Sequence, residues 1–182
     1  KLTLTTEQIS LKEVIEGIVN IMQPQIKTKK QTFDIHVKNI LTENVWCDGV
    51  RLNQVLLNLL SNATKYTPEG GTIQLSLSEE KSPKGENYVR TYIKVKDNGI
   101  GMAPEFLKKI FESYSRADGA RIHKTEGTGL GMAITKYIVD AMEGTINIKS
   151  ELDKGTEFLL TFDFEKAVVM EMNMVLPPWN ML

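Results

Sequence analysis

The stretch that decides the fold is RLNQVLLNLLSNATKYT, residues 51–67 of a 182-residue chain. Its apolar residues recur at three- and four-residue steps and cover much of the circumference of a helix, as in a helix buried in a core. These residues are Leu52, Val55, Leu56, Leu59, Leu60 and Ala63. The pattern therefore predicts a core helix that ends near Tyr66, where the breaker sequence TPEGG (67–71) begins.

A polar stripe interrupts this apolar helix. It consists of Arg51, Gln54, Asn58, Asn62 and Lys65. An amide oxygen suits magnesium, an ion that keeps several waters and takes phosphate oxygens as ligands. The ammonium of Lys65 would offset phosphate charge. Asn58 and Asn62 would equally serve to hydrogen-bond neighbouring backbone, so the stripe alone leaves a ligand site and a structural role open.

The segment DNGIG, residues 97–101, directly follows a predicted strand. Asp97 would accept a hydrogen bond from an exocyclic amine, which would favour adenine over guanine. Gly99 and Gly101 would let the backbone approach a flat ligand closely. An ordinary Asn-Gly turn explains the pair Asn98-Gly99 as well.

The segment GTGLG, residues 127–131, opens a predicted helix. The free N–H groups of a first helical turn form an anion site. No Gly-Lys-Ser/Thr follows, which excludes a P-loop, and the glycine spacing and preceding polar loop exclude a dinucleotide fingerprint. A flexible hinge is the alternative interpretation of residues 127–131.

The dipeptide Gly155-Thr156, taken alone, predicts only a turn that leads into a strand.

The remaining periodicities predict an α+β fold. Helices are predicted at about 11–29, with Ser10 as N-cap, and at about 130–142, with Gly144 as C-cap. A short helix opens at Pro104, and strands are predicted at 2–6, 32–38, 45–47, 72–78, 88–96, 145–150 and 156–164. Because the strands are mainly hairpin-linked and do not alternate regularly with helices, we expect a two-layer α/β sandwich, with a mixed sheet covered by helices on one face. Residues 1–166 form one domain in this prediction, and 167–182, with Pro177-Pro178, form a linker.

Composition narrows the classes of function. The formal net charge is −1 with 25% charged residues, which excludes the electrostatic footprint of a nucleic-acid binder. No apolar run has the length of a membrane span. The single cysteine, Cys47, is predicted to be a small buried hydrophobe, and the Lys27-Lys29-Lys30 cluster a solvated surface.

In chain order, these segments resemble the nucleotide-binding domain of sensor histidine kinases, within the wider family that shares the Bergerat ATP-binding fold. Residues 58–67 resemble its N box, 97–101 and 127–131 its two glycine boxes, and 155–158 its closing element. Residues 111–114 resemble its F box, with Tyr114 where phenylalanine is usual. The resemblance spans roughly residues 4–164.

This resemblance implies binding of ATP or ADP with Mg²⁺ and transfer of the γ-phosphoryl group to a protein histidine. It implies that Asn62 is the magnesium ligand, with Asn58 and Lys65 beside it in the catalytic set. Tyr66 would meet the base or sugar, and residues of about 102–126 would form a lid. The implied base pocket is Asp97, Gly99, Ile100, Gly101 and Thr156, and the implied phosphate cradle is Gly127, Thr128, Gly129, Leu130 and Gly131.

The resemblance also implies partners. The phosphoacceptor histidine would lie in a helical dimerisation domain preceding this segment, since neither His36 nor His123 sits in an acceptor motif. The Pro-Pro tail leads us to expect a receiver domain, in cis or in trans, as in hybrid kinases. The chain would then be a cytoplasmic domain of a membrane-anchored sensor kinase, making no membrane contact itself.

Two other functions are weighed against this one. A hydrolase of the gyrase, chaperone or mismatch-repair type would carry a glutamate at the position of Asn58. A nucleotide-sensing module would bind ATP without transferring phosphate, and the intact motif set argues against such degeneration.

Overall fold

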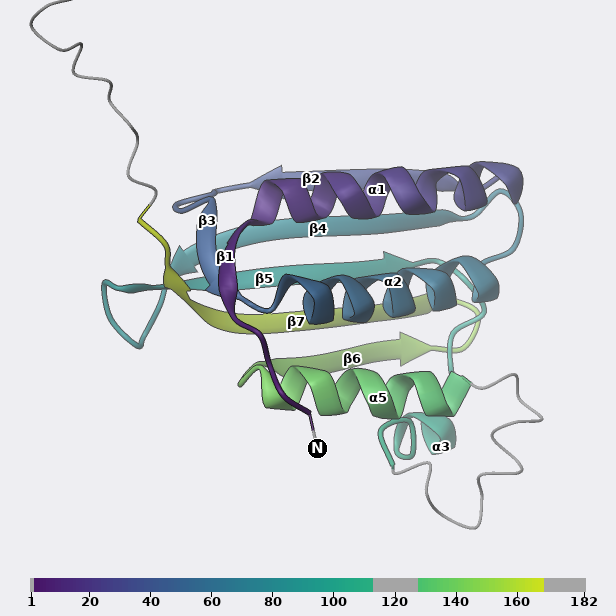
Figure 1. Cartoon of the computed structure of the whole chain (residues 1–182). Coiled ribbons are helices and arrows are strands. Elements are labelled where there is room, and N and C mark those ends of the chain that lie inside the picture. Colours follow the sequence, from purple (N-terminus) through teal and green to yellow (C-terminus); the bar gives the residue numbers. More distant parts are fainter. Residues whose placement is uncertain (1, 113–127, 169–182) are drawn as a thin grey trace, which may run out of the picture.

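The computed structural model describes residues 2–112 and 128–168, with the side chains of 128–130 excepted. Within these residues a seven-stranded sheet has the order β1-β3-β7-β5-β4-β2, and β6 pairs with β7 (Figure 1). The strands are β1 (Glu7–Ser10), β2 (Thr32–Lys38), β3 (Asn44–Cys47), β4 (Thr72–Lys81), β5 (Tyr88–Asp97), β6 (Thr145–Glu151) and β7 (Gly155–Lys166). The helices are α1 (Leu11–Thr28), α2 (Gly49–Tyr66), α3 (Pro104–Leu107) and α5 (Thr128–Ala141).

The sheet is mixed, and α1, α2 and α5 lie on one face of it (Figure 1). The edge strand β2 pairs with β4 in parallel, whereas the β4–β5, β5–β7 and β6–β7 pairs are antiparallel. The predicted fold class, a two-layer sandwich with helices on one face of a mixed sheet, is confirmed.

The core lies between α2 and the centre of the sheet. Along β4, alternate residues (Ile73, Leu75 and Leu77) are buried because successive side chains point to opposite faces. The apolar positions predicted for α2 are all buried in the core cluster. Burial of each such aliphatic side chain contributes about 1.5–3 kcal/mol. The core therefore holds α2 in place on the strands.

Two local predictions concern the ends of helices. Ser10 is confirmed as the N-cap of α1, since its Oγ accepts from the backbone N–H of Glu13 at 3.2 Å. Gly144 takes part in the cap of α5 as predicted, since its backbone N–H donates to the carbonyl oxygen of Val139 at 3.0 Å; the left-handed residue of this cap is Glu143, with φ of 60°. Gly144 is required for another reason, because a Cβ there would lie 2.4 Å from the ring of Phe162.

The prediction of a strand at residues 2–6 is wrong. The strand lies at Glu7–Ser10 and pairs with β3. The preceding residues instead contact helices: the N–H of Thr5 donates to Asp48 Oδ2 at 2.8 Å, and that of Leu2 to the hydroxyl of Tyr137 at 3.1 Å. Alternation of side chains alone cannot distinguish such an extended segment from a strand.

Cys47 is buried as predicted, and the burial raises its pKa to about 12.

The lysine cluster at the C-terminal end of α1 is predicted to be solvated; Lys27 and Lys30 are exposed as predicted, whereas Lys29 is half-buried. The Nζ of Lys29 donates to the carbonyl oxygens of Thr64 and Lys65, at 2.8 and 3.0 Å. Lys29 therefore caps the C-terminal turn of α2.

Among the described helices, none combines the length and apolar character needed to cross a membrane.

Candidate functional site

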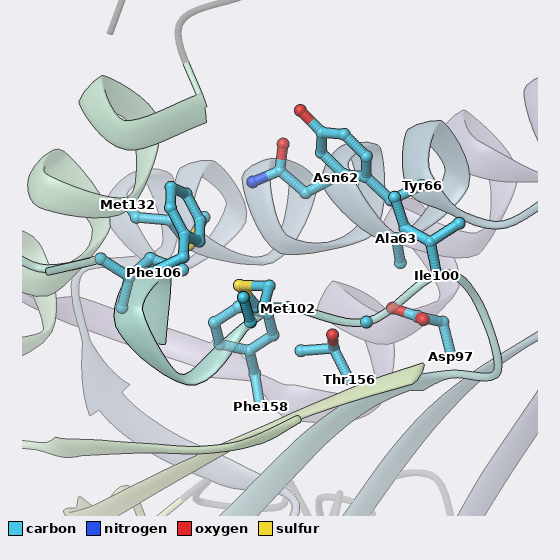
Figure 2. A pocket seen from close by; sticks show the side chains of 13 residues that line it. Asn62, Ala63, Tyr66, Asp97, Ile100, Met102, Phe106, Met132, Thr156 and Phe158 are labelled. Atoms are coloured by element: carbon cyan, nitrogen blue, oxygen red, sulfur yellow. The ribbon is translucent and has the colours of Figure 1, made fainter. Parts of the chain in front are cut away.

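A pocket of about 260 Å³ opens between the C-terminal half of α2 and the ends of β5 and β7 (Figure 2). From α2, Asn62, Ala63 and Tyr66 line one side of it, while Asp97 and Thr156 lie at the strand ends opposite. The other described residues that line it are Ile100, Gly101, Met102, Ala103, Phe106, Ile110, Met132 and Phe158. The pocket thus brings together four segments that lie far apart in the sequence: α2, residues 97–110, α5 and β7.

Asp97 is the last residue of β5 and is 8% exposed. Burial raises the pKa of its carboxyl, an effect partly offset by hydrogen bonds donated by the backbone N–H groups of Gly99 and Thr156. The bond from Gly99 to Asp97 Oδ1 measures 2.9 Å. These bonds orient the carboxyl within a largely apolar pocket, where it can accept from a ligand amine.

The glycines after Asp97 are required by close packing. A Cβ on Gly99 would lie 2.3 Å from the carbonyl oxygen of Tyr66, so β5 could not lead into this loop so close to α2. Gly101 has φ of +69°, and a Cβ there would lie 1.9 Å from the carbonyl oxygen of Glu151. Both glycines are thus needed where the protein's own backbone comes close, and their predicted role in letting the backbone approach a flat ligand stays a prediction.

The remaining walls are apolar. Met102 and Phe106 follow the first glycine segment, Met132 follows Gly131, and Phe158 comes from β7. From the sequence, Met102 and Phe106 are predicted in a lid and Phe158 in a motif, and none of them is predicted in the pocket. Met132 is not predicted at all. The available signal is a large apolar residue directly after a glycine motif.

The polar stripe of α2 divides in the structure. Asn62 borders the pocket, whereas Asn58 Nδ2 donates to the carbonyl oxygen of Gly131 at 2.9 Å and to Thr135 Oγ1 at 2.6 Å. Asn58 thus joins α2 to α5, in agreement with the structural alternative for this residue. Lys65 is exposed, with its Nζ 5.5 Å from the ring centroid of Tyr66.

The first two residues of the stripe lie away from the pocket. Arg51 donates to Gln54 Oε1 at 3.0 Å at the opposite end of α2.

Of the two histidines, His36 is exposed on β2. Gly127, the second half of the F box and His123 lie outside the described residues, and Thr128, Gly129 and Leu130 form the first turn of α5.

The lining residues suit the base of a nucleotide. The buried Asp97 carboxylate at the end of an apolar pocket could accept a hydrogen bond from an exocyclic amine, and the Ile100, Met102 and Phe158 side chains offer apolar contact. Ligand pockets usually measure about 300–1,000 Å³, so this volume suits a base more than a whole nucleotide. The amide of Asn62 at the rim provides an oxygen of the kind that magnesium accepts.

The fold and this pocket define a class of nucleotide-binding domain, and comparison with known proteins agrees. The chain belongs to the family described as histidine kinase-, DNA gyrase B-, and HSP90-like ATPases, whose model matches residues 47–166. It is 36% identical over 167 residues to the autoinducer 2 sensor kinase/phosphatase LuxQ of Vibrio vulnificus, covering 92% of this chain and 19% of LuxQ.

Solved structures give the same result. ShkA, whose full-length structure is in complex with AMPPNP, superposes with a TM-score of 0.74 at 28% identity, over 92% of this chain and 33% of ShkA. The catalytic domain of the histidine kinase ThkA superposes with a TM-score of 0.69 at 23% identity, over 88% of this chain and 96% of that domain. The chain is therefore an ATPase domain of the sensor histidine kinase type, and it spans about a fifth of the length of LuxQ.

Proposed function

We propose that this domain binds Mg²⁺-ATP and delivers its γ-phosphoryl group to a histidine carried by a helical dimerisation domain outside these residues. The observation that carries the proposal is the buried Asp97 carboxylate at one end of an apolar pocket whose rim bears the Asn62 amide. The sensor-kinase relatives and the AMPPNP bound to ShkA support it.

In this proposal the pocket binds the adenine. Asp97 accepts from the exocyclic amine, and Thr156 provides a hydroxyl beside it. Gly99 and Gly101 bring the loop close to α2, so that Ile100 covers the base. Tyr66 lies on the α2 side of the pocket and contacts the base or sugar.

The phosphates then extend from the pocket along α2 towards the start of α5. Asn62 offers the protein ligand to magnesium, and Lys65 neutralises phosphate charge. Thr128, Gly129, Leu130 and Gly131 open α5, and the free N–H groups of its first turn, together with Gly127, would bind phosphate oxygens. Asn58 keeps this turn beside α2 through its bond to Gly131.

Phosphoryl transfer requires positioning and charge neutralisation more than covalent chemistry by the protein. Bound magnesium would neutralise charge on the phosphate oxygens. The chain's residues hold the nucleotide with its terminal phosphate exposed to the incoming imidazole, whose neutral nitrogen is already nucleophilic. No general base is therefore needed in the domain, and Asn58, engaged with α5, does not activate water.

The remaining architecture is proposed on the same basis. Residues of about 102–126 would form a lid over the nucleotide, and residues 167–182 would link the domain to a receiver domain. The parent protein would be a membrane-anchored sensor kinase with this domain on the cytoplasmic side.

The test is transfer of labelled γ-phosphate to a purified helical hairpin that bears the phosphoacceptor histidine. We expect label on the hairpin and slow phosphate release in its absence. Fast release without the hairpin would establish a hydrolase instead. Binding of ATP with neither outcome would establish a nucleotide-sensing module.

A further inference from the structure

The hydroxyl of Ser150, near the end of β6, makes contacts to three other residues around the pocket. It accepts from the backbone N–H of Met102 at 2.9 Å. It lies 3.1 Å from the carbonyl oxygen of Gly155 and 2.8 Å from Thr156 Oγ1. Met102 and Thr156 both line the pocket, whereas Ser150 stands behind them. None of the sequence motifs described above includes Ser150.

The donor and acceptor count of a hydroxyl limits what these contacts can be. Ser150 has one proton and two lone pairs, and the Met102 N–H occupies one lone pair. Its proton goes either to the Gly155 carbonyl or to Thr156 Oγ1. If Ser150 donates to the Gly155 carbonyl, the Thr156 hydroxyl donates to Ser150 and offers only lone pairs to the pocket. If Ser150 donates to Thr156, the Thr156 hydroxyl can donate its own proton to a ligand.

The neighbouring turn forms a platform for the same loop. The carbonyl oxygen of Ile100 accepts from the N–H of Asp153 at 2.8 Å. The α-carbon of Gly101 packs against the carbonyl of Glu151 so tightly that a Cβ would lie 1.9 Å from its oxygen. Together with the Met102–Ser150 bond, these contacts attach the loop after Asp97 to the β6–β7 turn, residue by residue.

Thr156 in turn is coupled to Asp97. The two residues are register partners in the β5–β7 pair, and the backbone N–H of Thr156 donates to the Asp97 carboxylate. Ser150 therefore contacts, on one side, the residue that supports the carboxylate and, on the other, the backbone of an apolar wall. Ser150 thus contacts both Met102 and Thr156, two of the residues that line the pocket.

We propose that Ser150 is a positioning residue of the base pocket, whose hydroxyl holds the Thr156 hydroxyl and the Met102 backbone in the arrangement that receives adenine. The inference rests on the proposed function for its ligand. The geometry it asserts belongs to the ligand-free protein as well.

The test compares Ser150→Val with Ser150→Thr, two branched side chains of matched shape that differ in a methyl for the hydroxyl. Ser150→Val leaves the Met102 N–H without its acceptor, and we expect ATP and ADP to bind about tenfold more weakly, by calorimetry. The factor should be equal for both nucleotides because the contact is at the base end. Ser150→Thr should retain nearly normal affinity. Ser76→Ala, which removes a strand hydroxyl that accepts from Gln74 away from the pocket, is the control and should bind normally.

Amide hydrogen exchange of the ligand-free protein provides the second readout. The Met102 amide should lose protection in Ser150→Val and keep it in Ser150→Thr and Ser76→Ala. Unchanged protection, or equal loss in the Val and Thr variants, overturns the proposal. Failure of the unmodified chain to bind ATP would defeat the proposed function while the exchange result still decides the role of Ser150.

Discussion

The side-chain nitrogen of Asn58 lies 2.9 Å from the carbonyl oxygen of Gly131. This hydrogen bond connects two helices that are far apart in sequence, and a second bond from the same nitrogen to Thr135 Oγ1 reinforces it. A Cβ on Gly131 would lie 2.9 Å from Asn58 Oδ1, so the Asn58 amide would have to move from its present position to accommodate one. The N-terminal part of α5 is thus held against α2 by the Asn58 amide, which packs where Gly131 has no side chain.

Asn58→Ala should lower the free energy of unfolding by about 1–2 kcal/mol, because two donated hydrogen bonds are lost at a partly buried site. Asn58→Asp keeps the shape but removes the donor, so it should be destabilising as well. Urea denaturation measures both. Gln54→Ala, at an exposed position of the same helix, is the control and should change stability by no more than about 0.5 kcal/mol. Equal effects of the Asn58 and Gln54 variants would show that the contact contributes nothing specific.

Asp97→Asn should abolish binding of Mg²⁺-ATP while the domain stays folded. The asparagine retains one acceptor oxygen for the Gly99 N–H but presents an amide donor in place of an acceptor, which opposes the exocyclic amine of adenine. Calorimetry would measure affinity, and circular dichroism would confirm the fold.

Asn62→Asp should also abolish binding of Mg²⁺-ATP, because it adds a negative charge beside the phosphates. Unchanged affinity in either variant would remove that residue from the site.

The pH dependence follows from the same carboxyl, whose pKa is raised by burial above its ordinary value of 3.8. Because the folded state holds this proton more tightly than the unfolded state, Asp97 favours folding at low pH, and that contribution is lost as pH rises through the raised pKa. Nucleotide binding has the opposite sign, since it needs the ionised acceptor. Affinity should therefore fall as pH is lowered through the raised pKa, and a flat titration between neutral pH and about pH 4 would contradict the assignment.

The α2 pattern and the glycine segments predicted much of this fold and site, because both depend on local rules: helical periodicity, and glycine where backbones meet. Met132 and Ser150 escaped prediction, because their roles depend on which distant segments α5 and β6 adjoin. The strand misplaced at residues 2–6 shows the same limit. Alternation predicts that the segment is extended. Tertiary structure decides what the segment bonds to, here Asp48, the N-cap of α2, instead of a neighbouring strand.

Two glycines with opposite surroundings should respond oppositely to alanine. Gly17 lies inside α1, and a Cβ added there would have nothing within 4 Å, so Gly17→Ala should raise the free energy of unfolding by about 0.5–1 kcal/mol through helix propensity. At Gly99 the Cβ would lie 2.3 Å from the Tyr66 carbonyl oxygen, so Gly99→Ala should destabilise the fold and weaken nucleotide binding. Thermal unfolding separates the two, and a stabilising Gly99→Ala would show that the loop is free to shift.

The C-terminal end of α2 is capped from another part of the chain. The Nε2 of Gln31 donates to the carbonyl oxygens of Thr64, at 2.9 Å, and Thr67, at 2.5 Å, and Lys29 bonds the carbonyl of Thr64 as well. Gln31 is 8% exposed, so these carbonyls have little access to water as an alternative partner. The turn that bears Lys65 and Tyr66 therefore depends on residues that follow α1.

Gln31→Leu should lower the free energy of unfolding by about 1–3 kcal/mol, since it leaves the buried Thr67 carbonyl without this donor. Lys29→Met should cost less, because Lys29 is half-buried and water can replace its ammonium at the Lys65 carbonyl. Both variants should also weaken ATP binding, as the loosened turn carries Tyr66 at the pocket. Lys30→Met, at an exposed neighbour, is the matched control for charge. If Gln31→Leu lost stability but bound ATP normally, the cap would support the fold without shaping the site.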